Sequence, residues 1–283
     1  MNLSDANEIK ALLHANGFNF SKSLGQNFLI DPEVCPRMAD EAIPDASYGV
    51  LEIGPGIGVL TVELARRAAK VVSVELDDRL FPIMKKTLAD FDNIELVHGD
   101  ILKLDLHALL REHFGDMPVV VCANLPYYIT SPVITKLLQE HLPIESITVM
   151  VQKEAAERLC AEVGTRQAGA VTVAIAAYAE AEQLFFVPRS SFLPAPKVNS
   201  EVIRLTLRDT PIPLPDEAGF FRVVKAGFTQ RRKTVVNSLS QAFGLPKDRI
   251  REMLAACGLA ENLRPEALTL DDWIRLYRMS KAD

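Results

Sequence analysis

The stretch Val50-Leu-Glu-Ile-Gly-Pro-Gly-Ile-Gly58 decides the fold. It opens with three apolar residues around one acid, a run too short for a helix and of the right length for a buried strand. Three glycines follow at alternate positions, where they allow a tight turn and let a ligand lie against the backbone with no Cβ in the way. Residues 59–69 then repeat apolar side chains at helical spacing. The stretch therefore predicts a strand–loop–helix corner of a doubly wound sheet, where phosphates and nucleosides bind.

This glycine corner fits two classes of enzyme. A dinucleotide fold requires Gly-x-Gly-x-x-Gly, because the third glycine packs the helix on the strand, but Val59 occupies that position. The spacing is instead Glu-x-Gly-x-Gly-x-Gly, beginning at Glu52. It resembles the first motif of class I methyltransferases, which bind S-adenosylmethionine. The motif favours a methyltransferase and leaves a nicotinamide or flavin enzyme, and a structural glycine loop, as alternatives.

Length and composition limit the number of domains and the kinds of protein that the chain can be. The 283 residues suffice for one or two domains. No apolar run approaches the ~18 residues of a membrane helix, and the charged first ten residues do not form a signal peptide. The four cysteines lie far apart, with no Cys-x-x-Cys pair, and the five histidines are not at metal-binding spacing. We therefore expect a cytoplasmic protein with reduced cysteines, no metal and no membrane partner.

Acidic residues end the next two predicted strands. Residues 70–75 form an apolar run ending in Glu75, at the offset where a carboxylate accepts hydrogen bonds from the ribose hydroxyls of a bound nucleoside. Residues 94–100 form a third strand ending in Gly99-Asp100, and Asp100 could accept a hydrogen bond from the exocyclic amine of an adenine. The alternatives are a solvent-facing acid for Glu75 and a turn-forming Gly-Asp pair for Asp100.

A fourth predicted strand, residues 119–123, ends in Asn124-Leu-Pro-Tyr127. This combination of amide, proline turn and aromatic ring suits methylation of an exocyclic amine on a base. The side-chain oxygen of Asn124 and the carbonyl of Pro126 could each accept an N6 hydrogen of adenine, and Tyr127 could stack on the base. Alignment alone is worth up to ~7–11 kcal/mol, so no nucleophile or metal is required. The alternative is a tight turn with a packed tyrosine.

Seven motifs, in this order, resemble those of the bacterial small-subunit (16S) ribosomal RNA adenine N6-dimethyltransferases: Ser23-Leu-Gly-Gln-Asn-Phe-Leu29, Leu51-Glu-Ile-Gly-Pro-Gly-Ile-Gly58, Glu75, Gly99-Asp100, Asn124-Leu-Pro-Tyr127, Phe192-Leu-Pro-Ala-Pro-Lys-Val198 and Phe228-Thr-Gln-Arg-Arg-Lys233. The resemblance covers residues 18–240. It implies an α/β fold of the class I S-adenosylmethionine-dependent type, Rossmann-like with a mostly parallel seven-stranded sheet, and a small all-α C-terminal domain.

The resemblance also implies a reaction and a set of site residues. Members of the family dimethylate N6 of two adjacent adenines near the 3′ end of small-subunit ribosomal RNA, late in subunit assembly. By this resemblance the target adenine binds Asn124, Pro126 and Tyr127. The S-adenosylmethionine pocket is lined by Asn27, Leu29, Gly54, Glu75, Asp100 and Asn124. The arm at 18–29, whose composition alone favours an ordered surface loop, then becomes part of the site.

Two positions depart from the family pattern. Tyr128 follows the Asn-Leu-Pro-Tyr motif where an asparagine is common, and Ala168 stands where a larger, often aromatic, residue is frequent. Both leave the principal hydrogen-bonding groups in place. They therefore bear on the shape of the pocket and not on the reaction.

Three prolines at alternate positions mark residues 209–215 as a linker. It predicts a methyltransferase domain at 1–208, including the N-terminal arm, and a helical RNA-binding domain at 216–283. Net charge is −6 overall, but residues 189–233 hold nine basic and four acidic side chains, a local net charge of +5. Such a patch can follow an RNA backbone, although most charge runs are solvated faces. The candidate phosphate contacts are Lys197, Arg231, Arg232 and Lys233.

The sequence thus predicts a monomeric enzyme that acts on the small ribosomal subunit. One rival is the resistance methyltransferase family, which modifies one adenine of large-subunit ribosomal RNA. The Leu-Gly-Gln-Asn-Phe-Leu arm and the Pro-Ala-Pro-Lys-Val loop favour the small-subunit family. A non-catalytic assembly factor and a nicotinamide oxidoreductase are rivals from other classes. Intact Glu75, Asp100 and Asn124 argue against the non-catalytic factor, which has no need of them.

Overall fold

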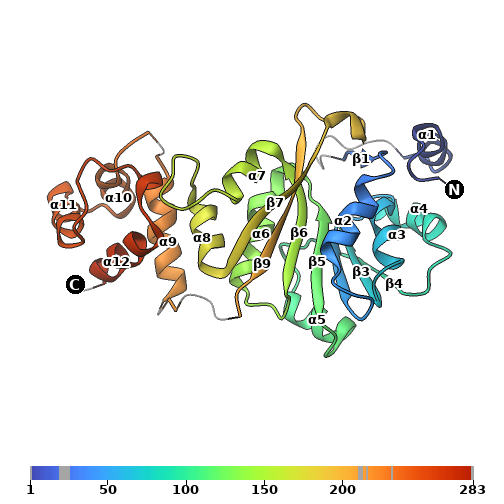
Figure 1. Cartoon of the computed structure of the whole chain (residues 1–283), viewed down its shortest axis with the longest axis horizontal. Coiled ribbons are helices and arrows are strands. Elements are labelled where there is room, and N and C mark those ends of the chain that lie inside the picture. The colour runs from blue at the N-terminus through green and yellow to red at the C-terminus, as the bar shows by residue number, and fades with distance from the viewer. Residues whose placement is uncertain (1, 19–25, 210–212, 215, 231, 282–283) are drawn as a thin grey trace. The chain divides into compact units, whose positions relative to one another are not determined.

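The computed structural model describes residues 2–18, 26–209, 213–214, 216–230 and 232–281. The chain forms two compact units. The first comprises Met1–Ala156 and Glu182–Leu207, and the second Glu157–Ala181 and Arg208–Asp283. Figure 1 shows the elements of both units.

The first unit is built on a seven-stranded sheet with the order β4-β3-β2-β5-β6-β9-β7. The five strands from β4 to β6 are parallel, and β9 runs antiparallel to β6. This arrangement confirms the mostly parallel sheet predicted from the sequence. The strands are β2 (Gly49–Ile53), β3 (Lys70–Glu75), β4 (Ile94–His98), β5 (Val119–Asn124), β6 (Ser146–Gln152), β7 (Ala179–Val187) and β9 (Ser200–Leu207).

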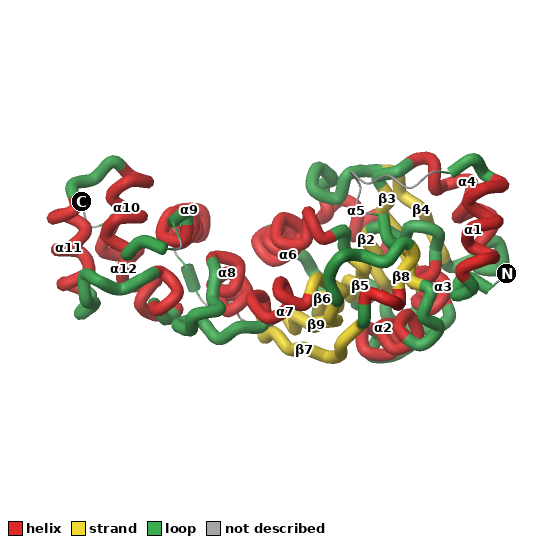
Figure 2. The backbone as a smooth tube through the Cα atoms, turned by 90° about the horizontal axis from the view of Figure 1, so that it is seen from above, coloured by secondary structure: helices red, strands yellow, loops and turns green. Residues whose placement is uncertain are grey.

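Helices cover both faces of this sheet. Figure 2 shows α5 and α6 on one side of the central strands and α2 and α3 on the other. Because both faces are covered, β2, β3 and β5 are buried almost throughout and read as continuous apolar runs. The helices are α2 (Val34–Ala42), α3 (Val59–Ala65), α4 (Phe81–Thr87), α5 (Leu106–Phe114), α6 (Thr130–Gln139) and α7 (Lys153–Leu159), with the short 3₁₀ helices η1 (Asp78–Leu80), η2 (Tyr127–Ile129) and η3 (Arg189–Ser191).

Two segments far apart in sequence join near the N-terminus. Helix α1 (Ala6–Ala15) is capped by Asp5, whose carboxylate accepts two backbone N–H groups of the first turn. Its buried face contributes to a core cluster that includes Phe28. The two-residue strand β1 (Phe28–Leu29) pairs antiparallel with β8 (Phe192–Leu193). The end of the N-terminal arm therefore meets the Pro-rich loop; residues 19–25 of the arm lie outside the described part of the chain.

The second unit is helical, as predicted for the C-terminal part. Its core centres on Trp273, which is fully buried. Asp216 caps the start of α9, and its carboxylate accepts the N–H of Gly219 and the hydroxyl of Tyr277, so that α9 and α12 are linked. The helices are α8 (Ala170–Tyr178), α9 (Glu217–Phe228), α10 (Val235–Phe243), α11 (Lys247–Ala256), η4 (Pro265–Ala267) and α12 (Leu270–Ser280).

The division into units differs from the predicted one in its placement of residues 157–181. The sequence prediction puts them in the domain that ends at 208, whereas they belong to the second unit. The reason is α8, whose apolar side chains include Val173, a member of the C-terminal core. The Tyr178 hydroxyl also donates to the Glu217 carboxylate at 2.8 Å. Among the described residues, none of the helices has the length and apolar character needed to cross a membrane.

Candidate active site

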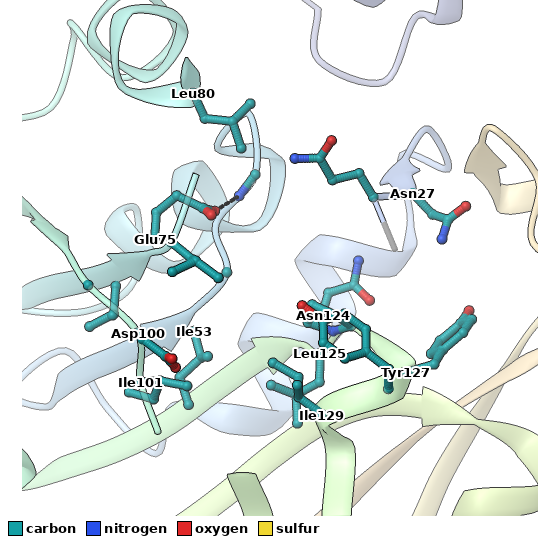
Figure 3. A pocket seen from close by; sticks show the side chains of 18 of the residues that line it. Asn27, Ile53, Glu75, Leu80, Asp100, Ile101, Asn124, Leu125, Tyr127 and Ile129 are labelled. Carbon is teal, nitrogen blue, oxygen red and sulfur yellow. Dashed lines mark hydrogen bonds between the residues drawn. The ribbon is translucent and has the colours of Figure 1, made fainter. Parts of the chain in front are cut away.

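The site lies at the carboxyl ends of four neighbouring parallel strands. In the order β4-β3-β2-β5 these ends carry Asp100, Glu75, Gly54 and Asn124. All four residues line one pocket, in which Figure 3 labels Asp100, Glu75 and Asn124. The pocket is open at its mouth, and the empty space in it, including open solvent, is about 850 Å³. This edge of an open α/β sheet is the usual position for a ligand.

The glycine loop leaves space for a ligand at Gly54. Its φ of +70° lies in the left-handed region, which favours glycine. A Cβ at this position would have only one heavy atom within 4 Å, Cδ of Pro126 at 3.9 Å. The side chain that glycine omits would therefore project into the pocket. Gly58, with φ of +90°, starts α3, and a Cβ there would lie 2.8 Å from Leu88.

Glu75 is almost completely buried, and backbone groups orient its carboxylate. Oε1 accepts the N–H of Asp77 at 2.8 Å and Oε2 accepts the N–H of Gly56 at 3.3 Å, the bond drawn in Figure 3. Burial raises the pKa of the carboxyl group, and these hydrogen bonds oppose the rise. Each oxygen keeps a further lone pair. The carboxylate is thus arranged to accept two hydroxyl hydrogens from the pocket.

Glu52, the acid ahead of the glycines, has a different environment. It is 1% exposed and does not line the pocket. In the register of β2 and β3 it lies beside Ser73, whose hydroxyl donates to Oε2 at 2.6 Å. Burial raises the pKa of Glu52 to about 7. Its position within the sheet points to a structural role.

Asp100 and several apolar side chains form another part of the pocket. The Asp100 carboxylate accepts the N–H of Leu102 at 3.0 Å and lies 3.3 Å from Nζ of Lys103. The apolar lining from the strand ends and the residues that follow them comprises Ile53, Val74, Leu76, Ile101, Leu125 and Ile129. A polar edge beside apolar walls suits a flat base.

The Asn124–Tyr127 motif is held by two hydrogen bonds. Asn124 is half-buried at the end of β5. The Pro126 carbonyl accepts the N–H of Ile129 at 3.1 Å, which leaves one lone pair for another donor. The Tyr127 hydroxyl lies 2.7 Å from Oγ of Ser200, which is fully buried at the start of β9. Sequence reasoning missed Ser200, because nothing local relates it to a tyrosine 73 residues earlier.

The arm contributes to the same pocket. Gln26 and Asn27 both line it, and Nε2 of Gln26 donates to Oδ2 of Asp77 at 2.7 Å. Leu29, predicted as a cofactor contact, is placed differently. Its pairing in β1 buries its side chain in the main core cluster, and it is not among the pocket residues.

The predicted phosphate contacts lie outside this pocket. Lys197 is exposed on the Pro-rich loop of the first unit. Arg232 and Lys233 are exposed in the second unit, and Arg231 lies outside the described residues. In the part of the chain that the structure describes, no three His, Cys, Asp or Glu side chains gather as a metal site would require.

Comparison with known proteins identifies the family. The family model for the ribosomal RNA adenine dimethylases matches residues 17–281. The chain belongs to this family. It is therefore an S-adenosylmethionine-dependent ribosomal RNA adenine dimethyltransferase.

Full-length relatives and solved structures agree with this membership. The chain is 48% identical over 274 residues to ribosomal RNA small subunit methyltransferase A of Geobacillus thermodenitrificans strain NG80-2, covering 94% of this chain and 93% of the relative. It is 45% identical over 281 residues to the protein of the same name in Streptococcus equi subsp. zooepidemicus strain MGCS10565, covering 98% and 97%.

Two crystal structures share the fold. A dimethyladenosine transferase from Plasmodium falciparum matches with a TM-score of 0.67 and 25% identity, covering 88% of this chain and 95% of that one. The 23S rRNA methyltransferase ErmE matches with a TM-score of 0.63 and 30% identity, covering 89% and 98%. The class I methyltransferase fold is thereby confirmed.

Proposed function

We propose that this protein dimethylates N6 of two adjacent adenines near the 3′ end of small-subunit (16S) ribosomal RNA, late in assembly of the subunit. One observation carries the proposal: Asn124, Pro126 and Tyr127 line the same pocket as Glu75 and Asp100. The site for the target adenine thus adjoins the site for the nucleoside part of the cofactor. The relatives at 45–48% identity, which are named for the small subunit, support this substrate over the large subunit.

The residues of the pocket fit S-adenosylmethionine. Gly54 leaves the space that a ligand needs, and the oriented oxygens of Glu75 would accept the two ribose hydroxyls. Asp100 would accept a hydrogen from the adenine amine, with Ile101 beside the base. Asn27, which lines the pocket, would contact the cofactor from the arm. When bound, the cofactor supplies an electrophilic methyl group on a sulfonium.

The target adenine requires a different contribution from the chain. Its N6 lone pair is delocalised into the ring and is a weak nucleophile. Oδ1 of Asn124 and the carbonyl oxygen of Pro126 would accept the two N6 hydrogens, which orients the nitrogen and favours tetrahedral geometry. Tyr127, held by Ser200, would stack on the base. The adenine must leave its helical stack to reach this position.

Contacts to the RNA backbone complete the proposal. Arg231, Arg232 and Lys233, together with Lys197, would bind phosphates, since positive side chains supply most of the sequence-independent affinity for RNA. The partner is the small ribosomal subunit, the protein acts as a monomer, and it works in the cytoplasm.

Methyl transfer to defined substrates tests this function. The chain would be incubated with labelled S-adenosylmethionine and either unmethylated small subunits, large subunits or naked RNA, followed by nucleoside analysis. We expect dimethyladenosine on small subunits alone. Label on large-subunit RNA would assign the protein to the activity of its relative ErmE, and cofactor binding without transfer would indicate an assembly factor.

Asn124→Ala tests the proposed N6 geometry. We expect transfer to be abolished with the fold intact, which circular dichroism and thermal unfolding would check. Near-normal turnover by this variant would refute the role of the amide.

A further inference from the structure

Tyr128 is an exposed aromatic residue in the active-site pocket. It lines the active-site pocket, yet its side chain is 54% exposed. Within the described residues no hydrogen bond, ring contact or cation–π contact of its side chain is found. The neighbouring Tyr127, by contrast, is half-buried and bonded to Ser200. Hydrogen bonds and ring contacts within the described residues therefore give no reason for an aromatic residue at position 128.

The local backbone fixes where this ring lies. Tyr127, Tyr128 and Ile129 form the 3₁₀ helix η2, in which successive side chains are about 120° apart. Tyr127 is directed to Ser200, so Tyr128 must point along a different direction, at the rim of the pocket. Pro126, with φ of −56°, and its hydrogen bond from Ile129 hold the entry to this helix. The exposed ring is thus mounted on a constrained backbone.

An aromatic ring at this position has a use in binding the proposed substrate. When one of two adjacent adenines turns into the pocket, the other loses a stacking partner, and this loss opposes binding. Exposed aromatic rings replace such stacking in proteins that bind single-stranded nucleic acid, and they tolerate any base. A ring at the rim of the pocket would be within reach of the nucleotide next to the target.

We propose that Tyr128 stacks on the adenine adjacent to the one in the pocket and holds the pair in position while each adenine is methylated in turn. This inference rests on the proposed function. It makes Tyr128 a substrate-positioning residue that contacts the RNA and not the cofactor. Removing the ring weakens binding of the dinucleotide and raises the share of RNA in which only one of the two adenines is modified.

The test compares Tyr128→Ala, Tyr128→Phe and Tyr128→Trp with Phe186→Ala. Phe186 is a matched control, because it is 50% exposed but does not line the pocket. For each variant, KM and kcat for unmethylated small subunits are measured, and mass spectrometry of the RNA fragment separates singly from doubly modified products. Calorimetry gives the Kd for S-adenosylmethionine.

For Tyr128→Ala we expect KM to rise about five-fold or more, the effect of one lost base–aromatic stack. Fragments with one modified adenine should accumulate, while the cofactor Kd stays unchanged. Phenylalanine or tryptophan at this position should restore both KM and product pattern, and Phe186→Ala should match the unaltered chain.

Three outcomes overturn the proposal: Tyr128→Ala with unaltered KM and products, a weaker cofactor Kd that accounts for the loss, or a loss equally large in Tyr128→Phe. Failure of the unaltered chain to methylate small subunits would instead overturn the proposed substrate, and this inference with it.

Discussion

Replacing Ser200 with alanine tests whether the fixed position of Tyr127 matters for methyl transfer. The two hydroxyls lie 2.7 Å apart, and Ser200 is fully buried. Tyr127 is only half-buried, so water can replace the lost partner, and we expect the free energy of unfolding to fall by about 0.5–1.5 kcal/mol. If the same interaction holds the ring in the transition state, its loss lowers kcat by up to about ten-fold.

Tyr127→Phe removes the tyrosine hydroxyl from the same hydrogen bond and should lower the free energy of unfolding further. It leaves the Ser200 hydroxyl buried without a partner, which costs about 1–3 kcal/mol. Tyr127→Phe should therefore be the more destabilising of the two single variants. Combining it with Ser200→Ala removes both hydroxyls, so the double variant should be more stable than Tyr127→Phe alone. Its kcat should be no lower than that of the worse single variant.

Urea denaturation and steady-state kinetics on small subunits, with cofactor binding by calorimetry as the control, complete this double-mutant cycle. The cofactor Kd should stay constant, because Ser200 does not line the pocket. Additive losses in kcat, or a normal kcat in Ser200→Ala, would refute the idea that Ser200 positions the tyrosine for catalysis.

Two further predictions concern charge. The pKa of Glu52 rises from 4.5 to about 7 in the folded chain, so this group favours the fold when protonated, and that stability is lost as pH rises from 4.5 through 7. Glu52→Gln has no group that titrates at this position, so it does not lose stability in this way. Between pH 4.5 and 7 its free energy of unfolding, relative to that of the unaltered chain, should increase by up to about 3 kcal/mol. A difference in urea titrations that does not change with pH would contradict this prediction. Neutralising Arg232 and Lys233 should weaken RNA binding and reduce the salt slope by about 1–2, and an unchanged slope would remove both residues from the interface.

The strand ends of the site could be predicted from the sequence because the decisive signals are local. Each apolar run of β2, β3 and β5 is followed directly by its functional group, Gly54, Glu75 or Asn124. Parallel strands bring their carboxyl ends to one edge of the sheet, so these groups converge once the strands are neighbours. A correct assignment of strand type therefore sufficed to assemble the pocket.

The parts that sequence could not predict depend on distant partners. The bond from Tyr127 to Ser200 spans 73 residues, and that from Gln26 to Asp77 spans 51. Leu29 lies in a strand of two residues, too short for any periodicity to show which way its side chain faces. The apolar pattern of α8 indicates that the helix is buried, but it does not indicate which helices pack against it.

Helix α8 belongs to the second unit, although the chain returns to the first unit after it. This has a consequence for protease digestion. The chain passes between the two units at three places, near residues 156, 181 and 207. A single cut in the linker at 209–215 would leave residues 157–181 attached to the methyltransferase fragment and still inserted in the core around Trp273. The two pieces should separate on a denaturing gel yet elute together from a sizing column. A fragment ending at 208 and produced alone would carry Val173 on an uncovered apolar helix and should aggregate.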